Sequence, residues 1–131
     1  MTKDELIENF SYLSDWEDKY RYLIELGESL EPMLQNEKIT ENKVSGCMSQ
    51  VWISHSCTNG KHHFVMDSDA HIVKGLGAVL LILVNDKTKD EILSLNIPAI
   101  FNEIGLEEHL SPTRRNGFTG MIERIHNFIN T

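Results

Sequence analysis

Cysteine is scarce in this chain, with only Cys47 and Cys57 among its 131 residues. A chain of this length buries about two-thirds of the surface that its unfolded form exposes. It therefore needs neither a disulfide nor a structural metal to hold a core. The sequence contains no Cys-x-x-Cys spacing. That absence argues against thioredoxin-like redox chemistry and against the commonest zinc sites.

Long apolar runs are also missing. The longest, from Leu76 to Val84, is far too short to cross a bilayer. The first residues, Met1 to Glu5, become acidic at once and lack the apolar core of a secretory signal. We therefore expect a cytoplasmic protein that binds no membrane, in a compartment where thiols stay mostly reduced.

Positive charge is in short supply. Twelve Lys and Arg residues stand against twenty Asp and Glu residues, which gives a formal net charge of -8. Such a surface repels nucleic acid and anionic membranes, and no run rich in Lys and Arg offsets it. We expect no nucleic-acid partner. A basic patch on another protein is the better electrostatic match.

No repeat, low-complexity tract or Pro/Gly-rich linker divides the chain, which predicts a single domain over residues 1–131. Helices are predicted where capping patterns precede apolar residues at helical spacing, at Thr2, Ser14, Thr88 and Ser111–Pro112. We expect Pro98 to be the first residue of a further short helix, which Gly105 closes. The stretch from Asp69 to Val84 fits either a buried strand or a helix, and its length favours a central helix.

The middle of the chain predicts a β-hairpin. Residues Gln50–Cys57 and Lys61–Asp67 are rich in β-branched and aromatic side chains, and Asn59 and Gly60 lie between them. Asn-Gly favours a type I′ turn, because both central residues of that turn need positive φ. We predict a hairpin over about residues 50–67 and an edge strand over about residues 42–45. Helices around one small antiparallel sheet make an α+β domain.

Cys47 is the first candidate for chemistry. It follows Gly46 in a loop just before the first predicted strand, where a thiol is presented to a partner. Loop amides or a nearby cation raise the fraction of thiolate, which is the nucleophile. The alternative is that Cys47 packs as a small buried hydrophobe, and the local sequence leaves both interpretations open.

The sequence also contains candidate residues for two other kinds of site. A metal or cluster scaffold needs three or four soft ligands, and the candidates on the facing strands are His55, Cys57, His62 and His63. Adjacent residues of a strand point to opposite faces, so His62 and His63 do not converge. A cysteine hydrolase needs a base beside its thiol, for which the candidates are His55, His71 and His109. Neither alternative has the ligand spacing or local motif that would make it specific.

Three stretches together resemble the SufE family of sulfur-acceptor proteins. They are Gly46-Cys47-Met48-Ser49-Gln50-Val51-Trp52, the segment from Asp67 to Leu76, and the segment from His109 to Phe118. The early segments 16–20 and 24–27 also fit the family. The resemblance covers nearly the whole chain, in order and without a large insertion. It implies an α+β fold of the SufE/IscU type, in agreement with the periodicity.

The resemblance implies that Cys47 accepts sulfur from a SufS-like cysteine desulfurase and holds it as a persulfide. The pyridoxal phosphate of that reaction belongs to the desulfurase, and the carrier has no cofactor of its own. The carrier stimulates the desulfurase and passes sulfur to an iron–sulfur assembly scaffold of the SufBCD type. By the same resemblance we expect a sulfurtransferase-type carrier and activator rather than a stand-alone enzyme. The resemblance leaves room for a homodimer.

The resemblance also marks other positions around the cysteine loop. Asp69 is expected to orient that loop or meet the partner, although helix N-capping is a simpler role. Arg114 is expected to contact the desulfurase or steady the loop, although a solvated first-turn arginine is the simpler alternative, and His109 matches without an assigned role. Gly46, Gln50 and Trp52 are expected to position the loop.

Two positions depart from the family pattern. Met48 lies where the family often has a polar residue, which alters the packing expected of the loop. Cys57 is outside the pattern. Its alternatives are a second sulfur acceptor, a thiol that resolves oxidised Cys47, or no role.

Overall fold

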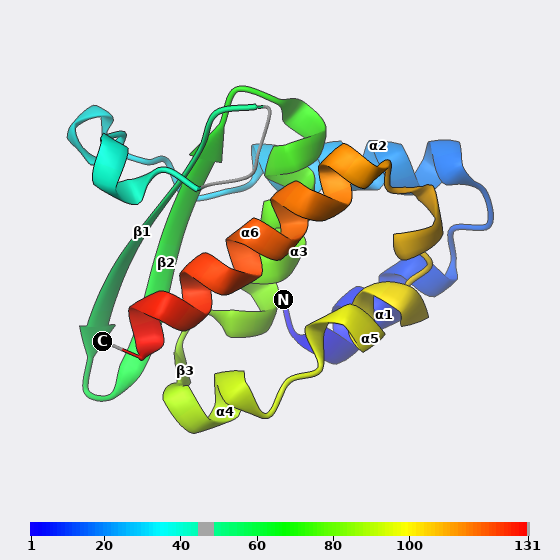
Figure 1. Ribbon diagram of the computed structural model, residues 1–131. Coiled ribbons are helices and arrows are strands. Elements are labelled where there is room, and N and C mark those ends of the chain that lie inside the picture. The colour runs from blue at the N-terminus through cyan, green and yellow to red at the C-terminus, as the bar shows by residue number, and fades with distance from the viewer. Residues whose placement is uncertain (45–48, 131) are drawn as a thin grey trace.

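The computed structural model describes residues 1–44 and 49–130 and has the predicted α+β architecture (Figure 1). Its helices are α1 (Lys3–Ser11), α2 (Trp16–Glu28), α3 (His71–Val84), α4 (Lys89–Leu93), α5 (Ile97–Glu103) and α6 (Pro112–Ile129). Short 3-10 turns are η1 (Gln35–Glu37), η2 (Thr40–Asn42) and η3 (Glu107–His109). The strands are β1 (Val51–Thr58), β2 (Lys61–Ser68) and β3 (Lys87–Thr88). No helix among the described residues is long and apolar enough to cross a membrane.

The hairpin forms where the sequence predicts it. Strands β1 and β2 pair antiparallel from Val51 opposite Ser68 to Thr58 opposite Lys61. The turn residues Asn59 and Gly60 have φ of 54° and 78°, as a type I′ turn requires.

The third strand differs from the prediction. The expected edge strand at 42–45 is reduced, among its described residues, to a single bridge between Lys43 and Trp52. The third strand is instead β3, which pairs with the start of β2 at the opposite edge of the hairpin and gives the order β1-β2-β3. A two-residue strand is too short to show a periodicity in the sequence. Its position depends on the partner strand.

Two helix starts are displaced by one residue from the prediction. The N-cap of α2 is Asp15 rather than Ser14, and its carboxylate accepts a hydrogen bond from the Asp18 amide. Helix α5 begins at Ile97, so Pro98 is its second residue, and Asn96 caps it. In both cases an Asx side chain adjacent to the expected start competes successfully for the cap.

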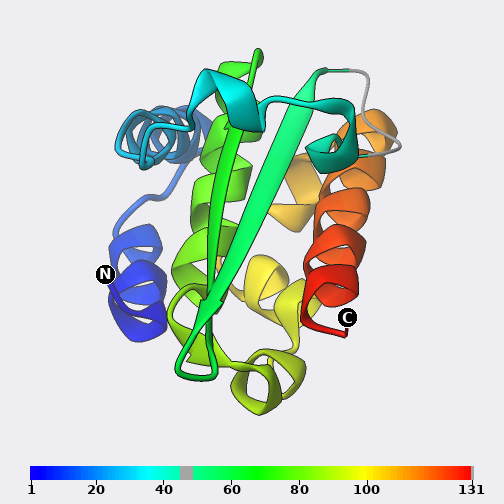
Figure 2. The same ribbon diagram turned by 90° about the vertical axis from the view of Figure 1, so that its left-hand side faces the viewer.

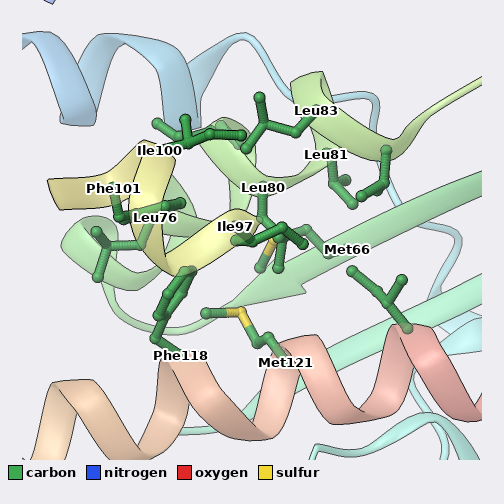
Figure 3. Packing of buried hydrophobic residues seen from close by; sticks show 14 of the residues in the cluster. Met66, Leu76, Leu80, Leu81, Leu83, Ile97, Ile100, Phe101, Phe118 and Met121 are labelled. Carbon is green, nitrogen blue, oxygen red and sulfur yellow. The ribbon is translucent and has the colours of Figure 1, made fainter. Parts of the chain in front are cut away.

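Helix α3 is the centre of the core. In Figure 2 it lies directly behind the hairpin, between α1 and α2 on one side and α6 on the other. It is apolar on nearly every face and ten of its residues are buried, which explains the uninterrupted run in the sequence. Figure 3 shows side chains of α3 between Met66 of β2, residues of α5, and Phe118 and Met121 of α6. The helices therefore cover one face of the sheet.

Helices α2 and α3 cross at two glycines. A Cβ on Gly27 would lie 2.9 Å from the backbone nitrogen of Gly75, and a Cβ on Gly75 would lie 2.7 Å from the carbonyl carbon of Leu23. The backbones approach too closely for any side chain at Gly75. This close approach explains why a glycine lies in the interior of α3, although glycine lowers helix stability there.

Candidate functional site

Cys47 and Gly46, the first two candidate residues, lie outside the described residues, which end at Val44 and resume at Ser49. The described residues on each side define where this segment is anchored. The amide of Val44 donates to the carbonyl of Val51 over 2.8 Å, and Lys43 bridges Trp52. Val44 is buried, so the entry to the segment is packed into the core.

Asp69 anchors the exit of the segment. Its carboxylate Oδ1 accepts from the Gln50 amide over 3.0 Å, and its own amide donates to the Gln50 carbonyl over 3.2 Å. The simpler role, N-capping of α3, is wrong. The N-cap is Ala70, and no side chain makes a capping hydrogen bond there. Asp69 and Gln50 are therefore brought together, and the carboxylate serves the strand rather than the helix.

A cavity opens next to Ser49, between the starts of α3 and α6. Its volume is about 370 Å³. Its lining combines small polar groups with core side chains, namely Ser49, Ala70, Ile72, Val73, Leu76, Ser111, Thr113, Arg114, Gly117, Phe118 and Met121. Arg114 and Ser49 thus line the same cavity, and Ser49 is the first described residue after Cys47. The close-up in Figure 3 shows Phe118 and Met121 facing α3 from this side of α6.

The electrostatics of this cavity favour an anion. No acidic residue lines it among the described residues, and Arg114 supplies a guanidinium. The first turns of α3 and α6 contain no acidic residue, like that of α5 and unlike those of α1, α2 and α4. Helix N-termini carry partial positive charge, and here two of them start at one cavity. A thiolate or persulfide anion would be stabilised in such surroundings.

Trp52 belongs to a second cluster on the other face of the hairpin. The Lys38 ammonium lies 5.8 Å from the centre of the Trp52 ring and 2.7 Å from Asp67 Oδ2. Lys74 approaches Asp67 Oδ1 over 3.5 Å. Burial alone would raise the pKa of Asp67, but hydrogen bonds from Lys38 and the Ser68 amide, with both lysine charges, hold it below its usual value. This cluster fixes the chain after α2 against the hairpin.

Sequence reasoning missed Lys38 and Lys74 as partners of Asp67. Lys38 lies in an irregular segment far from Asp67 along the chain. No local pattern predicts such a pair, because tertiary folding alone brings the two residues together.

The histidines that were metal candidates pair in other ways. His55 and His62 lie on one face of the hairpin with 2.7 Å between Nε2 and Nδ1, and the His55 ring stacks on Phe128. Burial, and then the charge of His62, lower the pKa of His55. Among the described residues no three His, Cys, Asp or Glu side chains are grouped to hold a metal. Cys57 is exposed near the hairpin turn.

His63 lies on the opposite face, as strand alternation predicts. Its Nε2 lies 2.9 Å from Glu31 and its Nδ1 lies 3.1 Å from Asp86. The hydrogen bond with Glu31 is the largest influence and raises the pKa of His63; Asp86 adds to the rise, and burial opposes it. His63 thus ties the chain after α2 to the turn before β3. The backbone of His109, the remaining candidate, lies in η3.

The described residues form an α+β domain with a candidate anion-binding cavity lined by Ser49, two residues after Cys47 in the sequence. The family model of SufE, described as an Fe–S metabolism associated domain, matches residues 4–129. The chain belongs to the SufE family. It is 44% identical over 126 residues to a SufE-like protein of Rhizobium etli, covering 93% of this chain and 85% of that one. It is 45% identical to a SufE-like protein of Rhizobium meliloti, covering 93% and 90%.

A solved structure shares the fold. The solution structure of a hypothetical protein from Thermus thermophilus superposes with a TM-score of 0.79 at 19% identity. The match covers 99% of this chain and 96% of that one. At this identity the likeness concerns the architecture alone.

Proposed function

We propose that this chain is a sulfur carrier of iron–sulfur metabolism, with Cys47 as its acceptor thiol. The donor is the persulfide of a SufS-like, pyridoxal-phosphate-dependent cysteine desulfurase, which the carrier also stimulates. The recipient is an iron–sulfur assembly scaffold of the SufBCD type. The reaction belongs to a cytoplasm in which thiols are kept reduced.

The transfer is a thiol exchange at sulfur. The Cys47 thiolate attacks the terminal sulfur of the donor persulfide and forms a new S–S bond. The S–S bond of the donor breaks, and its cysteine leaves as a thiolate. The proton on the terminal sulfur is transferred together with that sulfur or passes to solvent. No external oxidant or reductant is needed. The same exchange in the next step hands the sulfur to the recipient thiol.

The observation that carries this proposal is the cavity beside Ser49. Two helix starts and Arg114 face it, and its described lining is free of carboxylates. Such a place stabilises both the attacking thiolate and the persulfide anion formed in the transfer.

Mass spectrometry of the intact protein, incubated with the desulfurase of its host and cysteine, tests the proposal. Wild type, Cys47→Ser and Cys57→Ser are compared. We expect added sulfur in wild type and Cys57→Ser, and none in Cys47→Ser. Sulfur that survives in Cys47→Ser and disappears in Cys57→Ser would move the acceptor to Cys57. No added sulfur in wild type, beside an active desulfurase, would refute the carrier function.

A further inference from the structure

Arg124 joins the last turns of α6 to the chain that enters the Cys47 segment. Its Nη2 donates a hydrogen bond to the carbonyl oxygen of Glu41 in η2, 83 residues earlier in the sequence. Among the described residues, the other hydrogen bonds of η2 are local. The Asn42 side chain donates to Glu37, the Asn42 amide to Ile39 and the Lys43 amide to Thr40; these bonds shape the turn without fixing it to the helices.

The guanidinium of Arg124 is held in place by its own helix. It lies 4.5 Å from the ring centre of Phe128, one turn further along α6. Phe128 in turn stacks on His55 of β1 with 5.1 Å between ring centres. The Nε of Arg124 is buried, with no hydrogen-bond partner among the described residues. A desolvated donor is unfavourable, and the cation–π contact with Phe128 offsets part of that cost.

The contact lies just before the anchored entry of the segment. Glu41 precedes the Lys43–Trp52 bridge, and the Val44 amide then donates to Val51. The first turn of the same helix, α6, brings Arg114 to the cavity beside Ser49. Helix α6 therefore provides both Arg114, which lines the cavity, and Arg124, which binds the chain that enters the Cys47 segment. In Figure 2 the residues of η2 lie on the side of the hairpin where α6 runs.

We propose that Arg124 is a positioning residue for sulfur acceptance: through the Glu41 carbonyl it sets where the chain bearing Cys47 enters relative to the cavity wall on α6. The inference rests on the proposed function for its reaction readout. Arg124 touches neither the sulfur donor nor the reacting atoms in this role. Lysine replaces it only in part, because an ammonium can donate to Glu41 but cannot stack as a planar group on Phe128 at the same time.

The test compares Arg124→Met, Arg124→Lys and Arg115→Ala in a Cys57→Ser background, where Cys47 is the remaining thiol. Arg124→Met keeps most of the aliphatic stem and removes the donor. Arg115 is the matched control, because it also lies on α6 and donates to a main-chain carbonyl, that of Glu107, over 3.1 Å. Single-turnover transfer from a persulfidated desulfurase gives the limiting rate and the half-saturating concentration. Alkylation of Cys47 by iodoacetamide, followed across pH without desulfurase, gives a second readout.

We expect Arg124→Met to lower the limiting transfer rate roughly tenfold, with a half-saturating concentration within about twofold of the parent, because misplacement acts on the reacting geometry. The rate of Cys47 alkylation by iodoacetamide should change by at least about threefold for the same reason. Arg124→Lys should fall between Arg124→Met and the parent, and Arg115→Ala should match the parent.

Two outcomes would overturn the inference. One is equality of Arg124→Met and Arg115→Ala in both readouts. The other is a loss confined to thermal stability, with transfer and alkylation unchanged at temperatures where the protein is folded. Failure of the parent to take up sulfur would refute the proposed function instead. The alkylation comparison would still decide the role of Arg124, because it needs no desulfurase.

Discussion

Asp69 and Gln50 exchange two hydrogen bonds between the start of α3 and the residue before β1. The Gln50 amide donates to Asp69 Oδ1 over 3.0 Å, and the Asp69 amide donates back to the Gln50 carbonyl over 3.2 Å. One of the two bonds needs a side-chain acceptor, and the other needs only the backbone. Substitution at Asp69 can therefore remove half of the anchor and leave the other half in place.

Asp69→Ala should slow single-turnover sulfur uptake by Cys47 roughly threefold to tenfold, because the exit of its segment loses one of two anchors. The free energy of unfolding should fall by about 0.5–1.5 kcal/mol, the net value of one hydrogen bond. Asp69→Asn keeps an acceptor oxygen and is the control, with uptake close to wild type. Uptake by Asp69→Ala at the wild-type rate would contradict an anchoring role.

Arg114→Ala should reduce thiolate reactivity at Cys47. The guanidinium lines the cavity beside Ser49, and a nearby cation favours the charged form of a thiol. Alkylation by iodoacetamide at neutral pH should slow by roughly threefold or more, and its pH profile should move to higher pH. Arg114→Lys keeps the charge and should retain most of the rate. Arg115→Ala, the neighbouring cation on α6, serves as the control. An unchanged pH profile in Arg114→Ala would exclude this electrostatic role.

His63 should make stability depend on pH. Its ion pairs with Glu31 and Asp86 raise its pKa above the ordinary value of 6.5. A raised folded pKa contributes stability that is fully present below pH 6.5 and is lost as pH rises through the folded value. The side chain is 36% exposed, so after discounting for solvent screening we expect at most about 0.5–1 kcal/mol.

Urea unfolding of wild type and His63→Gln from pH 5.5 to 9 measures this effect. The difference in unfolding free energy should be largest at the acidic end and shrink toward alkaline pH. Comparing the two proteins at each pH cancels the opposite contribution of His55, whose pKa is lowered. A difference that grows with pH would show that the sign is wrong.

Gly75→Ala should destabilise the fold. A Cβ there would overlap the carbonyl group of Leu23 in α2, and the backbone of a packed helix cannot easily move aside. We therefore expect the free energy of unfolding to fall by about 1–3 kcal/mol. Gly77→Ala is the matched comparison in the same helix. Its Cβ would meet the side chain of Met66, which is flexible and can move aside. Thermal unfolding should rank wild type above Gly77→Ala, and Gly77→Ala above Gly75→Ala. The reverse order of the two variants would contradict the close crossing of α2 and α3.

The parts of the fold that sequence predicts are those with local causes. The Asn59-Gly60 turn fixes the register of the hairpin, and the capping pattern at Thr88 starts α4 as expected. The sequence did not predict strand β3, because its two residues are extended only through pairing with Lys61 and His62.

The candidate site shows the same limit. The family resemblance indicated Asp69 and Arg114 as site residues. The local sequence predicted that Asp69 caps a helix, whereas its carboxylate accepts a hydrogen bond from the Gln50 amide. Arg124 had no signal in the sequence, because its partner Glu41 is remote along the chain. Contacts that depend on where two distant elements meet cannot be derived from either element alone.

The length of strand β1 separates the chemistry of the two thiols. Cys57 lies seven residues beyond Gln50, about 23 Å along an extended strand. Cys47 lies three residues before Gln50, and three residues reach at most about 11 Å even when fully stretched. A disulfide needs Cα atoms within about 7 Å, so the two cysteines of one chain cannot join while β1 is intact. An oxidised Cys47 therefore depends on a thiol from another molecule for its repair, because Cys57 of the same chain cannot reach it.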